Sequence, residues 1–255
     1  MTAMEVLLLA LAGLGAGAAN MVAGGGTFVS YPTLLALGYP PITANVTSAV
    51  GLLAGYLGGS VSYRRELAGQ GTRLRQLIPA IVVGAVTGAT LLLLTPGETF
   101  STIVPYLVLS ACFLLIVQPW MKGYVQRHRE RNGRPESDRL SPAVHIGVAA
   151  AAVYGTYFGA GLGVLLLAVF GVLVADHLQR LNGLRSLISL LIKVIGVAVF
   201  AFSSQVAWLP VLVLAPTAYL GGALGAVVSR RLSEKVLRYT VIACGLVVAA
   251  LLFMQ

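Results

Sequence analysis

The residue that most needs a chemical explanation is Lys193, which stands within the apolar run Ser189-Leu-Leu-Ile-Lys-Val-Ile-Gly-Val. A lysine inside a membrane span costs at least ~2.5 kcal/mol on insertion scales unless it faces a cavity or a partner. Arg185 lies eight residues earlier, roughly 12 Å along a helix. Together they predict a cationic path for an anion, with Arg185 at its inner mouth. The alternatives are a snorkelling lysine, its contact with a helix C-terminus, and an ordinary loop charge at Arg185.

Two glycine-rich interruptions of apolar runs form a second candidate feature, at Gly24-Gly25-Gly26 and at Gly161-Leu-Gly163. Glycine is a poor helix interior, at roughly 1 kcal/mol per residue against alanine. Short helices that begin after these interruptions would point their N-termini, with free N–H groups and a partial positive charge, toward an anion. The alternative explanation is close helix packing through small residues.

Polar side chains that begin the following long helices, or flank the second interruption, complete the candidate site. Helix capping or packing explains some of them, whereas hydrogen bonds to substrate oxygens are the functional interpretation. The predicted substrate-binding residues are Gly24, Gly25, Gly26, Thr27, Asn45, Thr47, Ser48, Tyr157, Gly161, Gly163, Asn182, Arg185 and Lys193. Asp176-His177 ends a short apolar run and is a candidate for proton coupling.

The sequence lacks the motifs of other membrane functions. It contains no H-E-x-x-H, no G-x-S-x-G, no G-x-x-x-x-G-K-[ST] and no paired carboxylates inside its apolar runs. Cys112 and Cys244 lie in apolar runs without metal-ligand spacing. We therefore expect no catalytic residues, no metal and no cofactor.

Composition places the chain in a lipid bilayer. Of its 255 residues 58% are hydrophobic and 10% charged, against about 25% charged in soluble domains. The net charge of +9 comes from Lys and Arg in short loops, which is typical of cytoplasmic loops. We expect a multi-pass protein of the cell (inner) membrane and no nucleic-acid partner.

Apolar runs of about 20 residues predict eight full spans. They lie near 4–22, 43–63, 76–95, 101–121, 142–159, 184–203, 207–229 and 235–254. Two shorter runs, 27–38 and 164–175, follow the interruptions and are each about 18 Å long as helices. Either they cross the membrane or they re-enter on one side.

The chain repeats itself with an offset of 137 residues, which carries Asn45 onto Asn182 and the first glycine cluster onto the second. The predicted division is an N-terminal repeat (1–121), a basic cytoplasmic linker (122–140) and a C-terminal repeat (141–255). Basic loops of each half align with base-free loops of the other, so the positive-inside rule predicts oppositely inserted halves. The expected fold is an all-α integral membrane protein with two inverted-topology repeats of about five helices each, short helices after the glycine-rich breaks, and both termini outside.

The chain resembles the sulfite exporter TauE/SafE family of membrane permeases. The resemblance lies in Gly17-x6-Gly24-Gly-Gly with Pro32, Ala44-Asn45-x-Thr47-Ser48, and Gly155-x3-Gly159-Ala-Gly161-x-Gly163 with Asn182-x2-Arg185. It implies a secondary transporter that exports small sulfur-containing anions such as sulfite or organosulfonates, with an alternating-access site near the bilayer midplane. A lysine is common in the family where this chain has Arg185, so the charge is kept while the donor geometry differs.

Several functional alternatives stay open beside this interpretation. They are an anion channel, a permease for another small carboxylated anion and, last, an intramembrane enzyme. The sequence also leaves open a proton as the coupling ion and a homodimer as the assembly.

Overall fold

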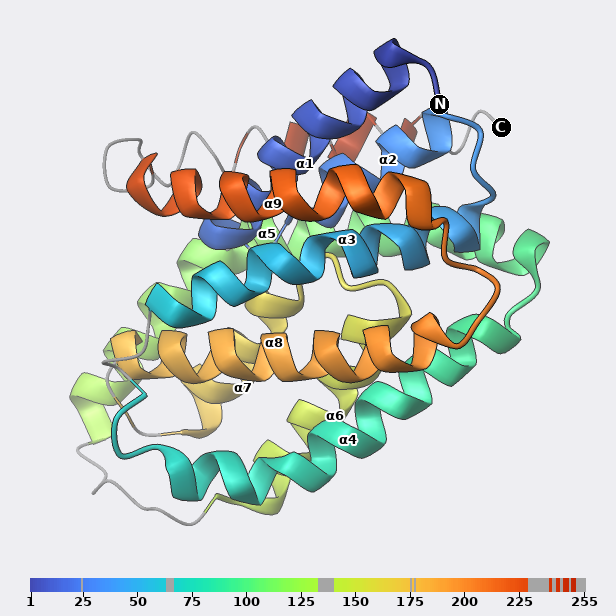
Figure 1. Ribbon diagram of the computed structural model, residues 1–255. Helices are drawn as coiled ribbons and strands as arrows, with labels where there is room; N and C mark the ends of the chain where they lie inside the picture. The colour runs from blue at the N-terminus through green and yellow to red at the C-terminus, as the bar shows by residue number, and fades with distance from the viewer. Residues whose placement is uncertain are drawn as a thin grey trace.

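The computed structural model describes residues 1–23, 25–62, 67–132, 140–174, 176 and 178–228, with 239, 242–243, 245–247 and 249–250 of the last segment. Within these residues the fold is helical throughout, which confirms the predicted all-α class (Figure 1). The helices are α1 (Ala3–Ala23), α2 (Thr27–Ala36), α3 (Pro41–Ser62), α4 (Gly71–Leu94), α5 (Gly97–Asn132), α6 (Pro142–Tyr157), α7 (Leu162–Leu173), α8 (Leu178–Ala201) and α9 (Trp208–Val228).

The helices follow the predicted apolar runs. Stretches of α1, α4, α5 and α8 are long and apolar enough to cross a membrane, and α7 and part of α9 are shorter apolar helices. The two short helices that follow the interruptions, α2 and α7, have 10 and 12 residues. Most of the span predicted at 235–254 lies outside the described residues.

Helix α5 continues past its apolar part as far as Asn132, so the first part of the predicted linker is helical. Residues 122–132 are rich in Lys, Arg, Gln and Glu, which lose little side-chain freedom in a helix and favour it. The remainder of the predicted linker, 133–139, lies outside the described residues.

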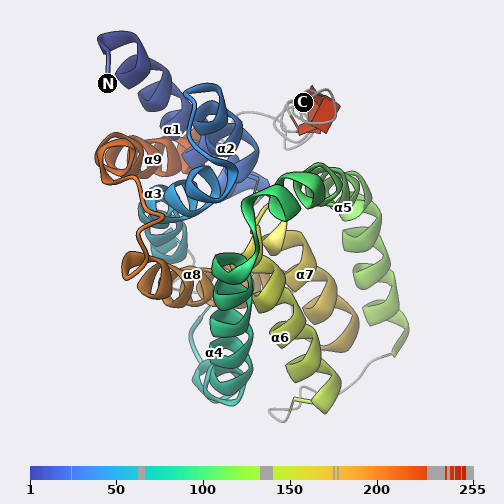
Figure 2. The same cartoon turned by 90° about the vertical axis from the view of Figure 1, so that its right-hand side faces the viewer.

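The helices form two bundles. The first contains α1, α2 and α3 with α9 from the second part of the sequence, and the second contains α6, α7 and α8 with α4 from the first part. Helix α9 packs on α1 and α3, whereas α4 packs on α6 and α8. Figures 1 and 2 show α1, α2, α3 and α9 together, and α4, α6, α7 and α8 together. Helix α3 packs on α8, and α5 contacts both α3 and α7, so the bundles meet through α3, α8 and α5.

Glycines allow α9 to pack closely on α1, and α4 on α6. A Cβ on Gly17 of α1 would overlap the backbone of α9, and a Cβ on Gly84 or Gly88 of α4 would overlap the backbone of α6. Both contacts are the small-residue packing typical of membrane helices. The glycines of α4 therefore serve close helix packing.

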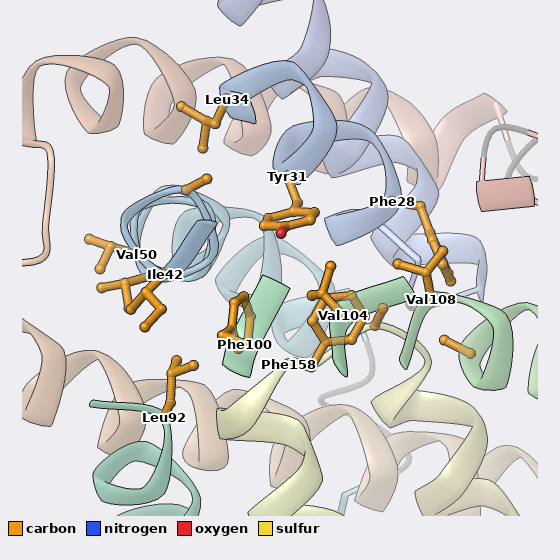
Figure 3. Close-up of a cluster of buried hydrophobic side chains, with 14 of the residues drawn as sticks. Phe28, Tyr31, Leu34, Ile42, Val50, Leu92, Phe100, Val104, Val108 and Phe158 are labelled. Carbon is orange, nitrogen blue, oxygen red and sulfur yellow. The ribbon is translucent and has the colours of Figure 1, made fainter. Parts of the chain in front are cut away.

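The hydrophobic cluster with the most buried members extends from the first bundle to α5 and the second interruption. Helices α2, α3 and α5 contribute the most members, and others come from α1, α4, α7, α8 and α9 and from the segment between α6 and α7. Figure 3 shows Phe28 and Tyr31 of α2 beside Val104 and Val108 of α5 and beside Phe158. Part of this cluster therefore lies where α2 and α5 meet the second interruption.

Candidate functional site

The side chain of Asn20 on α1 accepts a hydrogen bond from the backbone of the first interruption. The Gly26 amide donates to Asn20 Oδ1 at 2.9 Å, and the Gly25 amide reaches the Ala19 carbonyl oxygen at 3.5 Å. One of the amides expected to face an anion is therefore held within the protein. Gly24 lies outside the described residues, and Thr27 is buried as the first residue of α2.

Two hydroxyl groups join the first short helix to α3. Ser48 Oγ lies 2.6 Å from Ser30 Oγ, and Ser30 Oγ also donates to the Gly26 carbonyl oxygen at 3.3 Å. Both serines are completely buried. Ser48 is thus placed beside the first interruption.

Thr47 contacts the beginning of α9 rather than the first interruption. Its Oγ1 accepts a hydrogen bond from the Ala207 amide at 3.0 Å, just before α9 begins at Trp208. A helix N-terminus leaves amide donors without partners inside the helix, and Thr47 satisfies one of them from another helix. The sequence interpretation placed Thr47 at the start of its own helix, whereas α3 begins at Pro41, so Thr47 lies within α3 and caps α9 instead.

The second interruption contains two residues in the left-handed region. Gly159 has φ of 86° and Gly161 has φ of 77°, a conformation that costs residues with a Cβ roughly 1–2 kcal/mol. The Tyr154 hydroxyl donates to the Ala160 carbonyl oxygen at 2.7 Å and holds the turn from α6. Gly161 precedes the first residue of α7. The chain is therefore interrupted before α7, and Gly163 lies within that helix rather than in the break as predicted.

Both predicted cations of α8 reach this turn. Lys193 is 4% exposed, and its Nζ donates to the Gly155 carbonyl oxygen at 2.8 Å. Arg185 is 9% exposed, and its Nη1 lies 3.5 Å from the Gly163 carbonyl oxygen. The contact of Lys193 with the C-terminal part of α6, named above as an alternative, is therefore present. It also brings the ammonium against Gly159, because a Cβ there would overlap Nζ.

Asn45 connects the first part of the chain to the second interruption. Its Nδ2 donates to the Tyr157 carbonyl oxygen at 2.9 Å. The Tyr157 hydroxyl lies 3.3 Å from Thr95 Oγ1 and its ring packs against Phe100, so this side chain points toward the connection between α4 and α5. Asn182 is half-buried on α8, one turn before Arg185.

The two interruptions approach each other through α2 and α5. The rings of Tyr31 and Phe158 meet edge to face with centroids 6.0 Å apart. A Cβ on Gly161 would lie 3.6 Å from the Ala111 Cβ of α5. The structure thus gathers most predicted residues into two adjacent groups and directs Thr47 elsewhere.

Sequence reasoning missed three polar residues here, namely Asn20, Ser30 and Tyr31. The available signal was a polar side chain in or beside an apolar run, six residues before Gly26 for Asn20. Their partners are fixed by tertiary contacts that the sequence alone does not specify.

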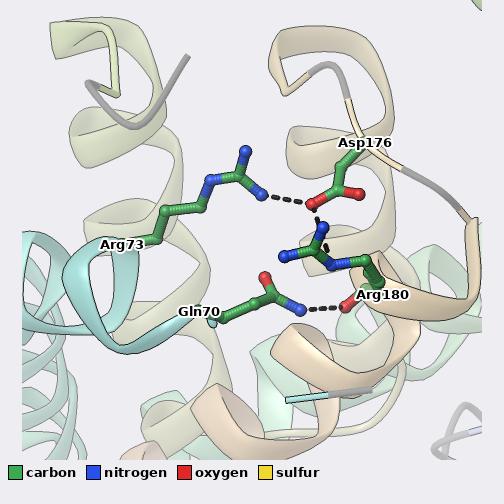
Figure 4. Close-up of polar contacts among 4 residues, drawn as sticks. All are labelled: Gln70, Arg73, Asp176 and Arg180. Atoms are coloured by element: carbon green, nitrogen blue, oxygen red, sulfur yellow. Dashed lines mark hydrogen bonds and ion pairs between the residues drawn. The ribbon is translucent and has the colours of Figure 1, made fainter. Parts of the chain in front are cut away.

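A separate polar cluster lies between the start of α4 and the segment before α8 (Figure 4). Asp176 forms an ion pair with Arg73 and lies 3.6 Å from Arg180 Nε, and Gln70 Nε2 donates to the Arg180 carbonyl oxygen at 2.9 Å. The Arg73 and Asp176 side chains are 3% and 1% exposed. The residue considered for proton coupling is thus part of a buried ion pair, while His177 lies outside the described residues.

The described residues include no group of three or more His, Cys, Asp or Glu side chains placed to hold a metal ion.

Comparisons with known proteins agree with a transporter. The family model described as "Sulfite exporter TauE/SafE" matches residues 9–252. "Probable membrane transporter protein ORF9" of Sinorhizobium sp. is 28% identical over 220 residues, which are 83% of this chain and 78% of that protein. "Probable membrane transporter protein YfcA" of Escherichia coli strain K12 is 22% identical over 235 residues, 92% of this chain and 84% of that protein. No solved structure matches the chain.

The family match covers almost the whole chain, and the relatives that match it are named as membrane transporters. The structure supplies several apolar helices long enough to span a bilayer. The chain is therefore a multi-pass membrane transporter that belongs to the sulfite exporter TauE/SafE family.

Proposed function

We propose that this protein is a secondary transporter that exports small sulfur-containing anions, such as sulfite or organosulfonates, through a site beside the second interruption. The observation that carries the proposal is the surroundings of Lys193. Its ammonium is buried, its hydrogen bond goes to a neutral carbonyl oxygen, and none of the salt bridges among the described residues reaches it. A buried charge needs compensation, and a bound anion supplies it.

The second cation and the second short helix strengthen this electrostatic argument. Arg185 contacts the first turn of α7 through Gly163, and the N-terminus of a helix carries a partial positive charge. A guanidinium presents donors in a planar fork that suits the oxygens of an oxyanion. Two cations and one helix N-terminus therefore favour a small oxyanion over a neutral or cationic substrate.

Alternating access follows from the proposed pair of inverted repeats. The 137-residue offset relates α1 to α6, α3 to α8, and α4 to α9. The packing of α1 on α9 then corresponds to that of α6 on α4, and the packing of α3 on α9 to that of α8 on α4. This correspondence supports a two-fold relation between the repeats, with the site between them. In such transporters one helix bundle rocks against the other around a fixed site.

Counterflow of labelled sulfite into proteoliposomes tests the proposal. We expect saturable uptake that unlabelled sulfite on the inside accelerates, and we expect Lys193→Met to raise the half-saturating concentration at least about tenfold, as for a lost charge-assisted contact. Arg127→Met removes an exposed arginine of α5 and serves as the control, with unchanged uptake.

Two results would contradict the proposal. Single-channel currents would identify a channel, and unchanged kinetics in Lys193→Met and Arg185→Met would remove the assigned site. Accumulation of sulfite in everted but not in right-side-out vesicles tests the direction of transport.

A further inference from the structure

Two buried polar groups beside the second interruption make no hydrogen bond to any described residue. They are Asn45 Oδ1 and the Tyr31 hydroxyl, and the two residues are only 2% and 1% exposed. Buried polar groups in native proteins are almost always hydrogen-bonded. Each of these two groups is therefore available to a ligand within the protein.

The orientation of the Asn45 amide follows from its neighbour. Nδ2 donates to the Tyr157 carbonyl oxygen, which only accepts hydrogen bonds, so the reversed amide would set two acceptors against each other. The open atom is consequently Oδ1, an acceptor. A fully deprotonated oxyanion offers acceptors alone and leaves this atom without a partner.

Tyr31 brings the second open group to the same backbone segment. Its ring meets that of Phe158 at an interplanar angle of 82°, and Phe158 follows the residue whose carbonyl holds Asn45. Figure 3 shows Tyr31 beside Phe158 and Val104. A phenolic hydroxyl both donates and accepts, so it suits an anionic oxygen. The contact between Ser30 and Ser48 keeps the helices that carry the two groups together.

We propose that Asn45 and Tyr31 select the transported anion by its hydrogen-bonding pattern. The substrate carries, besides its anionic oxygens, an O–H or N–H donor that binds Asn45 Oδ1, while the Tyr31 hydroxyl donates to one anionic oxygen. This inference rests on the proposed function, which assigns the negative charge to Lys193 and Arg185. It adds discrimination between anions of equal charge and similar size, which the cations cannot supply.

Three alkanesulfonates of equal chain length test the selection, one plain, one with a terminal hydroxyl and one with a terminal amine. Their competition with labelled sulfite is measured on the purified full-length protein in liposomes. The hydroxyl compound keeps the net charge constant, and the amine shows whether an N–H serves as well. Wild-type protein is expected to bind at least one donor-bearing compound roughly tenfold more tightly than the plain one, as for one additional buried hydrogen bond.

Two variants separate selection from folding. Asn45→Leu brings the affinity ratio of donor-bearing to plain compound to about one. Tyr31→Phe weakens all three compounds by roughly fivefold without lowering the melting temperature, because its hydroxyl has no internal partner to lose. Tyr219→Phe, on the exposed side of α9, is the matched control and changes neither property.

The outcomes are distinguishable. Transport that depends on Lys193 but shows no preference for either donor-bearing compound overturns the inference alone. An affinity ratio that survives Asn45→Leu, or unchanged affinities in Tyr31→Phe, does the same and assigns the open groups to water. The proposed function, and the inference with it, is overturned if the protein transports none of these anions or if Lys193→Met leaves the transport kinetics unchanged.

Discussion

Replacement of Gly159 by alanine displaces Lys193 without changing the lysine itself. The left-handed conformation of Gly159 makes any Cβ cost about 1–2 kcal/mol. That Cβ would also overlap Lys193 Nζ and lie 2.7 Å from the Gly155 carbonyl oxygen. The ammonium must then leave its hydrogen bond with this carbonyl, which is worth about 1.5–3 kcal/mol for a charged donor. We therefore expect Gly159→Ala to lose about 3–5 kcal/mol of unfolding free energy and to weaken sulfite transport.

Alanine substitutions at two other glycines measure the part of this loss of unfolding free energy that comes from backbone strain alone. Gly38 has φ of 84° with nothing within 4 Å of its Cβ position, and Gly161 has φ of 77° with its nearest neighbour at 3.6 Å. Alanine at either position should cost only the backbone strain, about 1–2 kcal/mol. Thermal and denaturant unfolding in detergent measures the three losses, and counterflow in liposomes compares Gly159→Ala with Gly38→Ala.

A double-mutant cycle gives the result that would refute the reasoning. Lys193→Ala removes the overlapping ammonium, so the Gly159→Ala change should cost at least ~1 kcal/mol less in that background. If the two losses add within about 0.5 kcal/mol, the pair is energetically independent. The side chain would then not occupy the position assigned to it, and a loss in Gly159→Ala equal to that of Gly38→Ala would lead to the same conclusion.

Three further perturbations test the packing around the site by unfolding in detergent. Asp176→Asn removes the carboxylate that pairs with the buried Arg73 and should lower the free energy of unfolding by about 3–5 kcal/mol. Asp176→Leu combined with Arg73→Met replaces the ion pair by apolar side chains and should recover much of that loss. Equal stability of the single and the double variant would contradict the buried ion pair. Gly84→Leu should separate α4 from α6 and lower the melting temperature, while Gly97→Ala, which meets no neighbour within 4 Å, should not. Thr47→Val removes the acceptor for the amide that precedes α9 and should cost about 1–3 kcal/mol, so an unchanged midpoint would exclude the capping role.

The helices themselves were predictable because their signals are local. Apolar runs and glycine clusters predicted the described spans, and the run predicted near 43–63 corresponds to α3, which begins at Pro41. The position of Lys193 beside a helix C-terminus was also among the stated alternatives, since a buried lysine must find an acceptor. Each of these conclusions needs only residues that are neighbours in the sequence or on one helix.

The partners of the polar residues were not predictable in the same way. Asp176 pairs with Arg73 across 103 positions of the sequence, whereas the sequence pattern assigned the Lys and Arg residues to short loops between apolar runs. In the structure Arg73 lies in the first turn of α4 and is buried by the segment before α8. Charge patterns identify the side of the membrane, but only the packing of α4 against α8 determines which carboxylate an arginine meets.

The exchange of α4 and α9 between the bundles explains why polar contacts gather at the beginnings of these two helices. Gln70, directly before α4, donates to the backbone of α8, and the Ala207 amide, directly before α9, donates to Thr47 of α3. The proposed repeat relates these contacts, because 137 positions separate Gln70 from Ala207.

The two ends differ in charge. The contact at α4 is accompanied by a buried ion pair, whereas the described contacts at α9 join neutral groups, with Thr43 Oγ1 donating to Gln205 Oε1 at 2.9 Å. Separating charged partners leaves unpaired buried charge, and separating neutral ones leaves unpaired dipoles, which cost less. Both contacts lie inside a bundle, because α4 packs on α8 and α9 packs on α3. Rocking of one bundle against the other therefore leaves both contacts intact, and the buried ion pair should hold α4 in its bundle more strongly than the neutral contacts hold α9.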